Sequence, residues 1–439
     1  MSKIGGERET DHLYDHFSTS GKVTGVGVKE SYHQIDHFTN AMLWEPEEPD
    51  ERAKLCVITM HGGYSREMRH SLMQEFAKRG FRAINVLPAQ YDFPSQMRDF
   101  TKAVDFARSL PGVEKVVLMG QSRGASIMSA YQRVAENGVK VFQGPGRRIQ
   151  FPDIGPLSPA DGLMLLDANY GFMQMLGISP CLLREGHATE FNPELDAINP
   201  ANGYAPQGAH YSPEFCRKFW DAQRERYMRL MDMAEERLHL IEQGKGDYFD
   251  DEPLYVAEMH GMLMSGGKLF CMDTHFFSHT AGEWPLIHPD GSITTQIVPS
   301  VRIAKCDPKS RGLLASAWPV TIRSFLQSEV RLAEGWGYDE SRFTGVDFNT
   351  CMTSPTGNVS EISVPLLCMG MTGSFEYITA EWTYNNAKSQ DKTIAFTEGA
   401  SHGFYTAKET EAYPGQWGDG MATTADYASR WLLEKGRFF

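Results

Sequence analysis

A serine at the centre of a Gly-x-Ser-x-Gly pattern is the first residue whose setting suggests chemistry: Gly120 and Gly124 flank Ser122. An apolar run at 116–119 precedes the pattern and a largely apolar stretch at 125–132 follows it, which predicts a buried strand, a sharp turn and a helix. Side chains in place of the two glycines would collide in so tight a turn. The turn presents the Ser122 hydroxyl outward at a helix N-terminus, where negative charge is favoured, so this serine is a candidate nucleophile.

A pair of glycines follows an earlier apolar run. The run at 55–60 ends in His61, Gly62, Gly63 and Tyr64. Two glycines directly after a buried strand let backbone amides approach a ligand closely, as an oxyanion pocket requires. A plain Gly-Gly turn is the alternative, and the serine turn downstream favours the oxyanion pocket.

Composition and charge narrow the class of partner. The 439 residues include 41% hydrophobic and 22% charged residues, as in an ordinary globular protein, and carry a formal net charge of −14. A nucleic-acid backbone or an anionic membrane would repel such a chain, so we expect a small-molecule substrate, no nucleic acid and no membrane. The seven cysteines are scattered without the spacing typical of zinc sites, so we expect free thiols and neither a metal nor a cofactor.

No segment of the sequence looks like a leader or a membrane anchor. The N-terminal residues include no apolar stretch, and no apolar run approaches the roughly 18 residues of a spanning helix. We therefore expect a cytoplasmic location. The sequence leaves the oligomeric state open, a homodimer included.

The order of apolar runs and amphipathic segments predicts an α/β protein. Early antiparallel strands are expected between residues 22 and 45, and apolar runs such as 82–87 and 162–167 predict buried strands. Helical patterns lie between these runs, for example at 95–110. Alternation of strands and helices with short connections predicts a mostly parallel sheet with helices on both faces.

This alternation pauses between the strand at 162–167 and the next buried strand at 364–371. The interval predicts a long helix that begins at Pro213 with Ser212 as its N-cap, and a second helix from about 311 to 335. We expect a large, mainly helical cap whose apolar side chains partly roof the serine, which favours a partly apolar substrate. The resulting division is a polar N-terminal arm at 1–20, a core domain at 21–171 and 361–439, and the inserted cap at 172–360.

Three glycine-containing motifs together resemble those of the α/β-hydrolase superfamily: the His-Gly-Gly at 61–63, the serine turn at 120–124, and Gly-Ala-Ser-His-Gly at 399–403 after the last predicted strand. The serine precedes the histidine, as in that superfamily. The resemblance implies an α/β-hydrolase sheet flanked by helices, with the cap inserted between the last strands.

The same resemblance implies roles for individual residues. Ser122 would be the nucleophile, and His402 the base that takes its proton and later returns it to the leaving group. Backbone amides of Arg123 and of Gly63 or Tyr64 would bind the oxyanion.

Three carboxylates are candidates for the acid that fixes the imidazole tautomer and stabilises the imidazolium. Asp167 ends the strand that follows the serine helix, a position used in some branches of the superfamily. Glu376 lies near the more usual position, after the strand at 364–371. Glu381 follows five residues later, where a carboxylate is favoured merely by opening a helix. Asp167 is our first choice, and Glu376 and Glu381 stay as alternatives.

The sequence therefore indicates a serine hydrolase that cleaves a carboxylic ester, lactone or thioester of a medium-sized, partly apolar molecule through an acyl-enzyme on Ser122. Carbon–carbon bond hydrolysis or acyl transfer by the same triad is the alternative. A ligand-binding protein without activity is a third hypothesis, because a fold does not guarantee a function.

Overall fold

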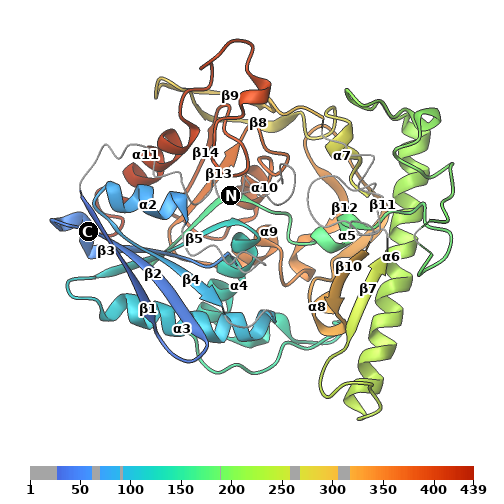
Figure 1. The fold of residues 1–439 in the computed structure, drawn as a ribbon, viewed down its shortest axis with the longest axis horizontal. Coiled ribbons are helices and arrows are strands. Elements are labelled where there is room, and N and C mark those ends of the chain that lie inside the picture. Colours follow the sequence, from blue (N-terminus) through green and yellow to red (C-terminus); the bar gives the residue numbers. More distant parts are fainter. Residues whose placement is uncertain (1–26, 62–69, 89–91, 188, 258–266, 305–316) are drawn as a thin grey trace, which may run out of the picture.

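A ten-stranded sheet lies at the centre of the computed structural model, which describes residues 27–61, 70–88, 92–187, 189–257, 267–304 and 317–439 (Figure 1). The strand order across the sheet is β1-β2-β4-β3-β5-β6-β13-β14-β8-β9. In that order the strands span Val28–Gln34, Thr39–Pro46, Arg82–Pro88, Leu55–Thr59, Lys115–Ser122, Gly162–Ala168, Leu366–Met371, Lys392–Thr397, His279–Ile287 and Ile293–Pro299.

The strands from β4 across to β8 run parallel, whereas β1, β2 and β9 pair antiparallel at the two edges. Strands β3, β6 and β13 are buried along their whole length, which is typical of strands covered on both faces. The predicted α/β class, with its mostly parallel sheet and early antiparallel strands, is confirmed.

Helices cover both faces of the sheet. Alternate residues of β5 show the two sides: Val116 and Leu118 pack with side chains of α3 and α4, whereas Val117 and Met119 belong to the cluster that contains α2 and α11. Helix α10 lies on the same face as α3 and α4. The helices are α2 Ser71–Lys78, α3 Phe93–Ser109, α4 Arg123–Asn137, α10 Thr379–Asn386 and α11 Gly420–Leu432.

The segment between β6 and β13 contains the longest helix, α6 (Pro213–Glu242), at the side of the molecule opposite β1 and β2 (Figure 1). The Ser212 side chain accepts a hydrogen bond from the Phe215 amide, so the predicted N-cap is confirmed. Two short antiparallel pairs accompany the helix, β7 with β10 and β11 with β12. Their bounds are β7 Pro253–Ala257, β10 Ala317–Thr321, β11 Arg331–Tyr338 and β12 Phe343–Asp347, and α8 (Ile322–Gln327) joins β10 to the approach to β11.

The helix predicted at about 311–335 is wrong over the described residues 317–335, which form β10, α8 and the start of β11. Pro319 has no amide proton, and the β-branched Val320 and Thr321 favour an extended backbone, so this part of the segment is a strand, β10. Thr321 then caps α8 by accepting a hydrogen bond from the Ser324 amide. A helical pattern of apolar residues thus coincides here with a strand, a short helix and a second strand.

Strands β8 and β9 belong to the main sheet although they lie within the segment expected to form the cap. Phe396 and Thr397 of β14 pair in parallel with Leu286 and Ile287 of β8. The segment 172–360 is therefore mixed in secondary structure rather than mainly helical, and it supplies two strands of the central sheet.

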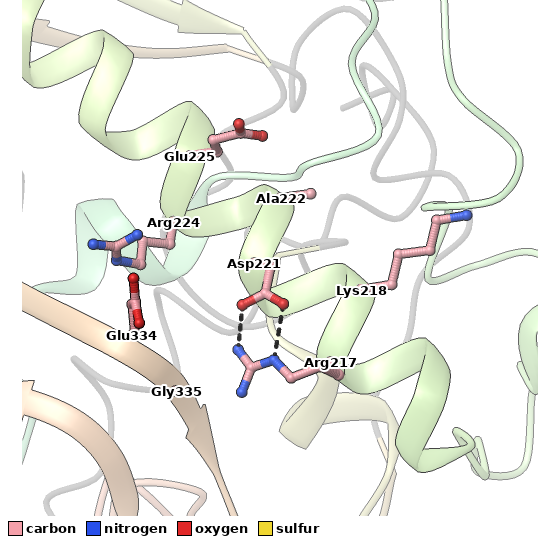
Figure 2. Close-up of a pocket in the computed structure, with 8 residues that line it drawn as sticks. All are labelled: Arg217, Lys218, Asp221, Ala222, Arg224, Glu225, Glu334 and Gly335. Atoms are coloured by element: carbon pink, nitrogen blue, oxygen red, sulfur yellow. Dashed lines mark hydrogen bonds and ion pairs between the residues drawn. The ribbon is translucent and has the colours of Figure 1, made fainter.

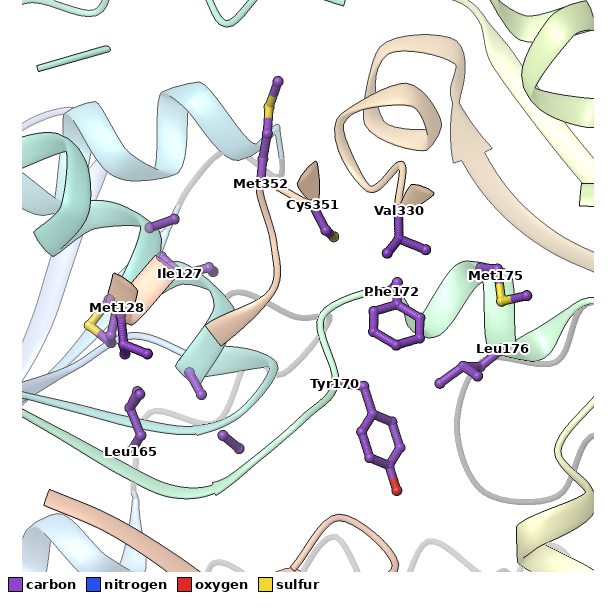
Figure 3. Packing of buried hydrophobic residues seen from close by; sticks show 14 of the residues in the cluster. Ile127, Met128, Leu165, Tyr170, Phe172, Met175, Leu176, Val330, Cys351 and Met352 are labelled. Atoms are coloured by element: carbon purple, nitrogen blue, oxygen red, sulfur yellow. The ribbon is translucent and has the colours of Figure 1, made fainter. Parts of the chain in front are cut away.

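One hydrophobic cluster runs from the sheet into this segment (Figure 3). Tyr170 and Phe172 leave the end of β6 and pack near Leu176 of α5 (Met173–Gly177) and near Val330 and Cys351 from the inserted segment. All of these side chains are buried, so apolar packing continues without a break from β6 into the inserted segment.

Within the described part of the chain, no helix combines the length and apolar character needed to cross a bilayer. The cysteines of that part are buried free thiols, as expected: Cys56, Cys181, Cys216, Cys271, Cys351 and Cys368.

Candidate active site

The turn between β5 and α4 holds Ser122 at a positive φ that residues other than glycine rarely adopt, with φ 53° and ψ −129°. A Cβ atom at position 120 would lie 2.5 Å from the Ala125 Cα, and one at 124 would lie 3.0 Å from the Met60 carbonyl oxygen. Glycine at both positions therefore permits the tight turn. A strained serine at a strand-to-helix turn is the geometry expected of a nucleophile elbow.

Ser122, Asp167, Glu376 and His402 lie at or just beyond the carboxyl ends of four neighbouring strands, β5, β6, β13 and β14 respectively. Two hydrogen bonds hold the serine turn to its neighbours: the Asn169 amide donates to the Ser122 carbonyl oxygen over 3.3 Å, and the Gln121 side chain donates to the His402 carbonyl oxygen over 2.8 Å. The carboxyl ends of parallel strands are where α/β sheets bind ligands.

His402 and Asp167 form a close pair, with 2.6 Å between the imidazole Nδ1 and the carboxylate Oδ2. Asp167 is fully buried, and its other oxygen, Oδ1, accepts a hydrogen bond from the Met371 amide of β13. Its φ of 49° is unusual for an aspartate. The two strands thus fix this carboxylate so that it faces the imidazole.

Glu376 approaches the same nitrogen from the loop after β13. Its Oε2 lies 3.2 Å from the His402 Nδ1, and its side chain is 3% exposed. Burial, together with the charge of Asp167, raises the pKa of Glu376 to about 7, although the positive charges of His402 and Lys268 oppose this. Two of the three candidate acids therefore meet at one nitrogen.

Glu381, the third candidate, is hydrogen-bonded elsewhere. Its carboxylate accepts hydrogen bonds from the amides of Ala281 and Gly282, at 2.9 and 2.7 Å, and from the Trp284 indole at 2.7 Å. These donors belong to β8, so the carboxylate attaches α10 to that strand.

The predicted oxyanion pocket is described in part. Arg123 is the first residue of α4, and the first turn of a helix presents backbone amides and favours negative charge. Gly63 and Tyr64 lie outside the described residues. His61 precedes them, and burial lowers its pKa to about 3, helped by the charges of His70, His402 and Arg123, so its imidazole is neutral.

Phe375 is a neighbour of His402 that the sequence analysis did not single out. Its ring is nearly parallel to the imidazole, at 22° and with 6.4 Å between the ring centroids. Tyr170 donates a hydrogen bond from its hydroxyl to the Phe375 carbonyl oxygen, and the Lys268 ammonium lies 5.9 Å from the Phe375 ring centroid. The one signal in the sequence was the position of Phe375 beside a candidate acid.

Among the described residues, the side chains of Asp167, Glu376 and His402 are the group close enough together to be considered for a metal ion. The Nδ1 atom that would have to coordinate a metal is the atom in the 2.6 Å contact with Asp167. This contact is a hydrogen bond between imidazole and carboxylate, so we treat the three side chains as a proton network.

A surface groove on α6 and β11 is lined by charged side chains, but the described residues there include no group like Asp167, Glu376 and His402 (Figure 2). Arg217 pairs there with Asp221 across one helical turn, at 2.8 Å. The other charged side chains that line the groove are Lys218, Arg224, Glu225 and Glu334. Positive and negative groups balance, and the lining includes neither a nucleophile nor a histidine.

Comparison with known proteins identifies similar structures but no sequence family. No protein-family model and no curated protein matches the sequence. The siderophore hydrolase EstB from Aspergillus fumigatus is 11% identical, with a TM-score of 0.42 over 92% of this chain and 97% of that one. Est1E from Butyrivibrio proteoclasticus is 11% identical, with a TM-score of 0.40 over 92% and 98% of the two chains.

A soluble variant of the monoglyceride lipase from Saccharomyces cerevisiae, in complex with a substrate analog, is also similar. It is 10% identical, with a TM-score of 0.41 over 94% of this chain and 97% of that one. At such identities none of these structures indicates a substrate for this chain.

Proposed function

We propose that this chain, which has the α/β-hydrolase fold, is a serine hydrolase that cleaves a carboxylic ester of a medium-sized, partly apolar molecule, lactones and thioesters included. The observation that supports this most directly is the 2.6 Å contact between His402 and Asp167, at the strand edge where the serine turn holds Ser122. Nucleophile, base and orienting acid on neighbouring strand ends are the parts that acyl transfer requires.

In the first half of the reaction the Ser122 oxygen attacks the ester carbonyl carbon while its proton passes to the His402 Nε2. Asp167 keeps the other imidazole nitrogen, Nδ1, protonated and stabilises the imidazolium that forms. The carbonyl π electrons move onto the oxygen, and collapse of this tetrahedral intermediate breaks the bond to the leaving group. His402 gives its proton to that group, and the acyl-enzyme remains on Ser122.

In the second half a water molecule replaces the leaving group. His402 takes one proton from the water as its oxygen attacks the acyl carbon, and then returns the proton to the Ser122 oxygen as the carboxylic acid leaves. Both tetrahedral intermediates carry an oxyanion, for which we assign the Arg123 amide and the amides of Gly63 or Tyr64. Every step uses groups of the chain itself and requires neither a metal nor a cofactor.

A partly apolar substrate is supported by the surroundings of His402. The half-buried Phe375 leaves apolar ring surface beside the imidazole, and Tyr170 behind it is fully buried. The site offers no described cluster of cations that would select a strongly anionic substrate, because Lys268 is buried and lies near Glu376.

The test is pre-steady-state kinetics with p-nitrophenyl esters of increasing acyl length. We expect a burst of nitrophenol that is lost in Ser122→Ala and His402→Ala, and labelling of Ser122 by a serine-reactive phosphonate probe that requires His402. Ser129→Ala is the matched control. Ser129 is a buried serine of α4 whose hydroxyl is engaged within the helix, where it donates to the Ser126 carbonyl oxygen, so its loss should leave the burst intact. A burst that survives in Ser122→Ala, or a folded parent that is neither labelled nor active, would overturn the proposal.

Product analysis separates the reactions that one triad can support. Hydrolysis gives the free acid in water, whereas acyl transfer gives a new ester or amide when an alcohol or amine is added. A diketone cleaved in preference to every ester would instead identify carbon–carbon bond hydrolysis.

A further inference from the structure

We propose that Glu376 is a second positioning residue of the site, which shares the Nδ1 side of His402 with Asp167 and adds its negative charge to the imidazolium once its own proton has left. The inference rests on the proposed function, because it concerns the base of that reaction.

The first support is geometric. The Glu376 Oε2 lies 3.2 Å and the Asp167 Oδ2 lies 2.6 Å from the one Nδ1 atom. The backbone around Glu376 is fixed, since its amide donates to the Ser374 hydroxyl and its carbonyl oxygen accepts from both the amide and the hydroxyl of Thr379. The carboxyl group is therefore held toward the imidazole by the loop rather than free to leave it.

The second support is the state of the carboxyl oxygen itself. The Glu376 Oε2 is buried and, within the described part of the chain, has no hydrogen-bond donor of good geometry. A buried carboxylate without donors is expensive, so a fold that needed it only for structure would supply them. The neighbouring Glu381 shows the alternative, with three N–H donors on its two oxygens.

The groups that face Glu376 come from four parts of the chain. Asp167 lies at the end of β6, Tyr170 in the connection after it, His402 in the loop after β14, and Lys268 just before α7 (Leu269–Met272). Burial and Asp167 favour the protonated carboxyl, whereas His402 and Lys268 favour the carboxylate. With the pKa of Glu376 raised to about 7, the carboxyl is neutral in acid and charged above neutrality.

The charge on Glu376 changes how strongly the imidazolium of His402 is stabilised. Below neutrality Asp167 alone faces the imidazolium. Above neutrality a second negative charge lies beside the same nitrogen, and it stabilises the imidazolium that forms as Ser122 attacks. Because the two carboxyls and the imidazole interact strongly, the proton belongs to the group of three rather than to one residue.

The first experiment compares kcat/KM of Glu376→Gln and of the parent across pH with a p-nitrophenyl ester. Glutamine copies the neutral carboxyl, so we expect the two proteins to agree within about two-fold near pH 5.5 and the variant to be about 5–20-fold slower near pH 8.5. Glu376→Asp keeps a carboxyl and should regain part of the rise with pH.

Glu381→Gln is the control for a buried carboxylate with a structural role, and its ratio to the parent should not change with pH. A Glu376→Gln ratio that is flat across pH, in a variant that is folded at every pH of the assay, would overturn the inference. The inference would also be wrong if kcat/KM of Glu381→Gln relative to the parent fell with rising pH as that of Glu376→Gln does.

The second experiment is a double-mutant cycle near pH 8.5. Asp167→Asn keeps the oxygen that accepts the Met371 amide, and Glu376 remains within reach of Nδ1 to hold the tautomer. We therefore expect the double variant Asp167→Asn, Glu376→Gln to lose at least about ten-fold more activity than the product of the two single losses. If the loss in the double variant only equals the product of the two single losses, Asp167 and Glu376 do not act together on one nitrogen and the inference is wrong.

Failure of this inference can be told apart from failure of the proposed function. If Ser122→Ala keeps the burst, the serine hydrolase proposal fails. If Ser122→Ala and His402→Ala abolish the burst while Glu376→Gln shows a flat ratio and additive losses, only the role of Glu376 fails.

Discussion

Two buried carboxylates five residues apart, Glu376 and Glu381, serve two regions of the molecule in different ways. Both are 2% exposed. Glu381 is saturated by three N–H donors of β8, whereas Glu376 faces an imidazole and another carboxylate without a donor for its Oε2 among the described residues. We call the first region the β8 anchor (Glu381 with Ala281, Gly282 and Trp284) and the second the strand-end cluster (Ser122, Asp167, Glu376 and His402).

The comparison teaches that burial alone does not separate structural from chemical carboxylates. A carboxylate whose oxygens are filled by N–H donors is stabilised in its charged form, and it fixes the elements that supply the donors. A buried carboxyl that lacks donors keeps a raised pKa and can exchange a proton near neutrality. Hydrogen-bond satisfaction is therefore the feature to examine first.

The largest effect expected is on activity in the strand-end cluster. Ser122→Ala removes the oxygen that we propose as the nucleophile and should lower kcat/KM by about 10⁵–10⁶-fold with the melting temperature unchanged. Glu381→Gln in the β8 anchor should keep kcat/KM within a few-fold of the parent at temperatures where it is folded. Ester assays and thermal melts on both variants check this, and a comparable loss of activity in the two would erase the distinction between the regions.

The next effect is a pH-dependent difference in stability between the parent and Glu376→Gln. Its pKa is about 7 in the folded protein against 4.5 ordinarily, so its contribution to stability is fully present below about pH 4.5 and is lost as the pH rises through about 7. Because glutamine does not ionise, the variant Glu376→Gln does not lose this stability at high pH. Its free energy of unfolding relative to the parent should rise by about 3 kcal/mol between about pH 4.5 and pH 8.

Urea unfolding at several pH values measures this difference. Glu381→Gln provides the comparison, since it changes a buried carboxylate that lies away from His402, on the amides of β8. A Glu376→Gln difference that stays constant with pH would mean that the carboxyl is ionised throughout.

A smaller effect is expected from the β8 anchor itself. Glu381→Gln leaves one acceptor oxygen for three donors and places an amide group where a second acceptor stood. A buried donor without an acceptor costs about 1–3 kcal/mol, so we expect the free energy of unfolding to fall by about 2 kcal/mol. Faster hydrogen exchange at the Ala281 and Gly282 amides would locate the change, and unchanged exchange there would contradict the role of the anchor.

Much of the fold followed from local patterns in the sequence. The parallel strands are continuous apolar runs separated by amphipathic helices, and the two glycines around Ser122 belong to a turn that few other residues can form. The same logic placed candidate acids at the end of β6 and after β13. Which of them meet His402 depends on side-chain directions across three strands, and spacing along the chain does not contain that information.

The segment between β6 and β13 shows where local patterns fail. Strands β8 and β9 join the sheet through the pairing of β8 with β14, a partner more than a hundred residues away in sequence. Such long-range pairing overrides local preference. Of the helix expected at about 311–335, the described residues 317–335 are instead shared between β10, α8 and β11, because Pro319 and the β-branched residues after it favour an extended backbone.

The smallest effect expected concerns Arg148, which joins the inserted segment to the core by ion pairs. Its guanidinium lies 2.7 Å from Asp232 and 3.0 Å from Glu329, and it also pairs with Glu235, so it serves several acceptors as Glu381 serves several donors. The Arg148 side chain is 16% exposed, and partial exposure to solvent weakens such pairs. We expect Arg148→Gln to lower the free energy of unfolding by about 1 kcal/mol, and by less in high salt, with kcat/KM unchanged.

The exposed pair of Lys218 with Glu194 is the matched control for Arg148. Its lysine and glutamate side chains are 50% and 71% exposed, so Lys218→Gln should change the unfolding free energy by less than about 0.5 kcal/mol. Urea unfolding of both variants at low and high salt makes the comparison. If Arg148→Gln lowered activity while the protein stayed folded, the ion pairs would be holding the inserted segment in place over the strand-end cluster, and the two regions would be coupled. If it changed only stability, as we expect, chemistry and attachment are separable in this fold, because β6 and β13 fix Asp167 and the loop after β13 fixes Glu376.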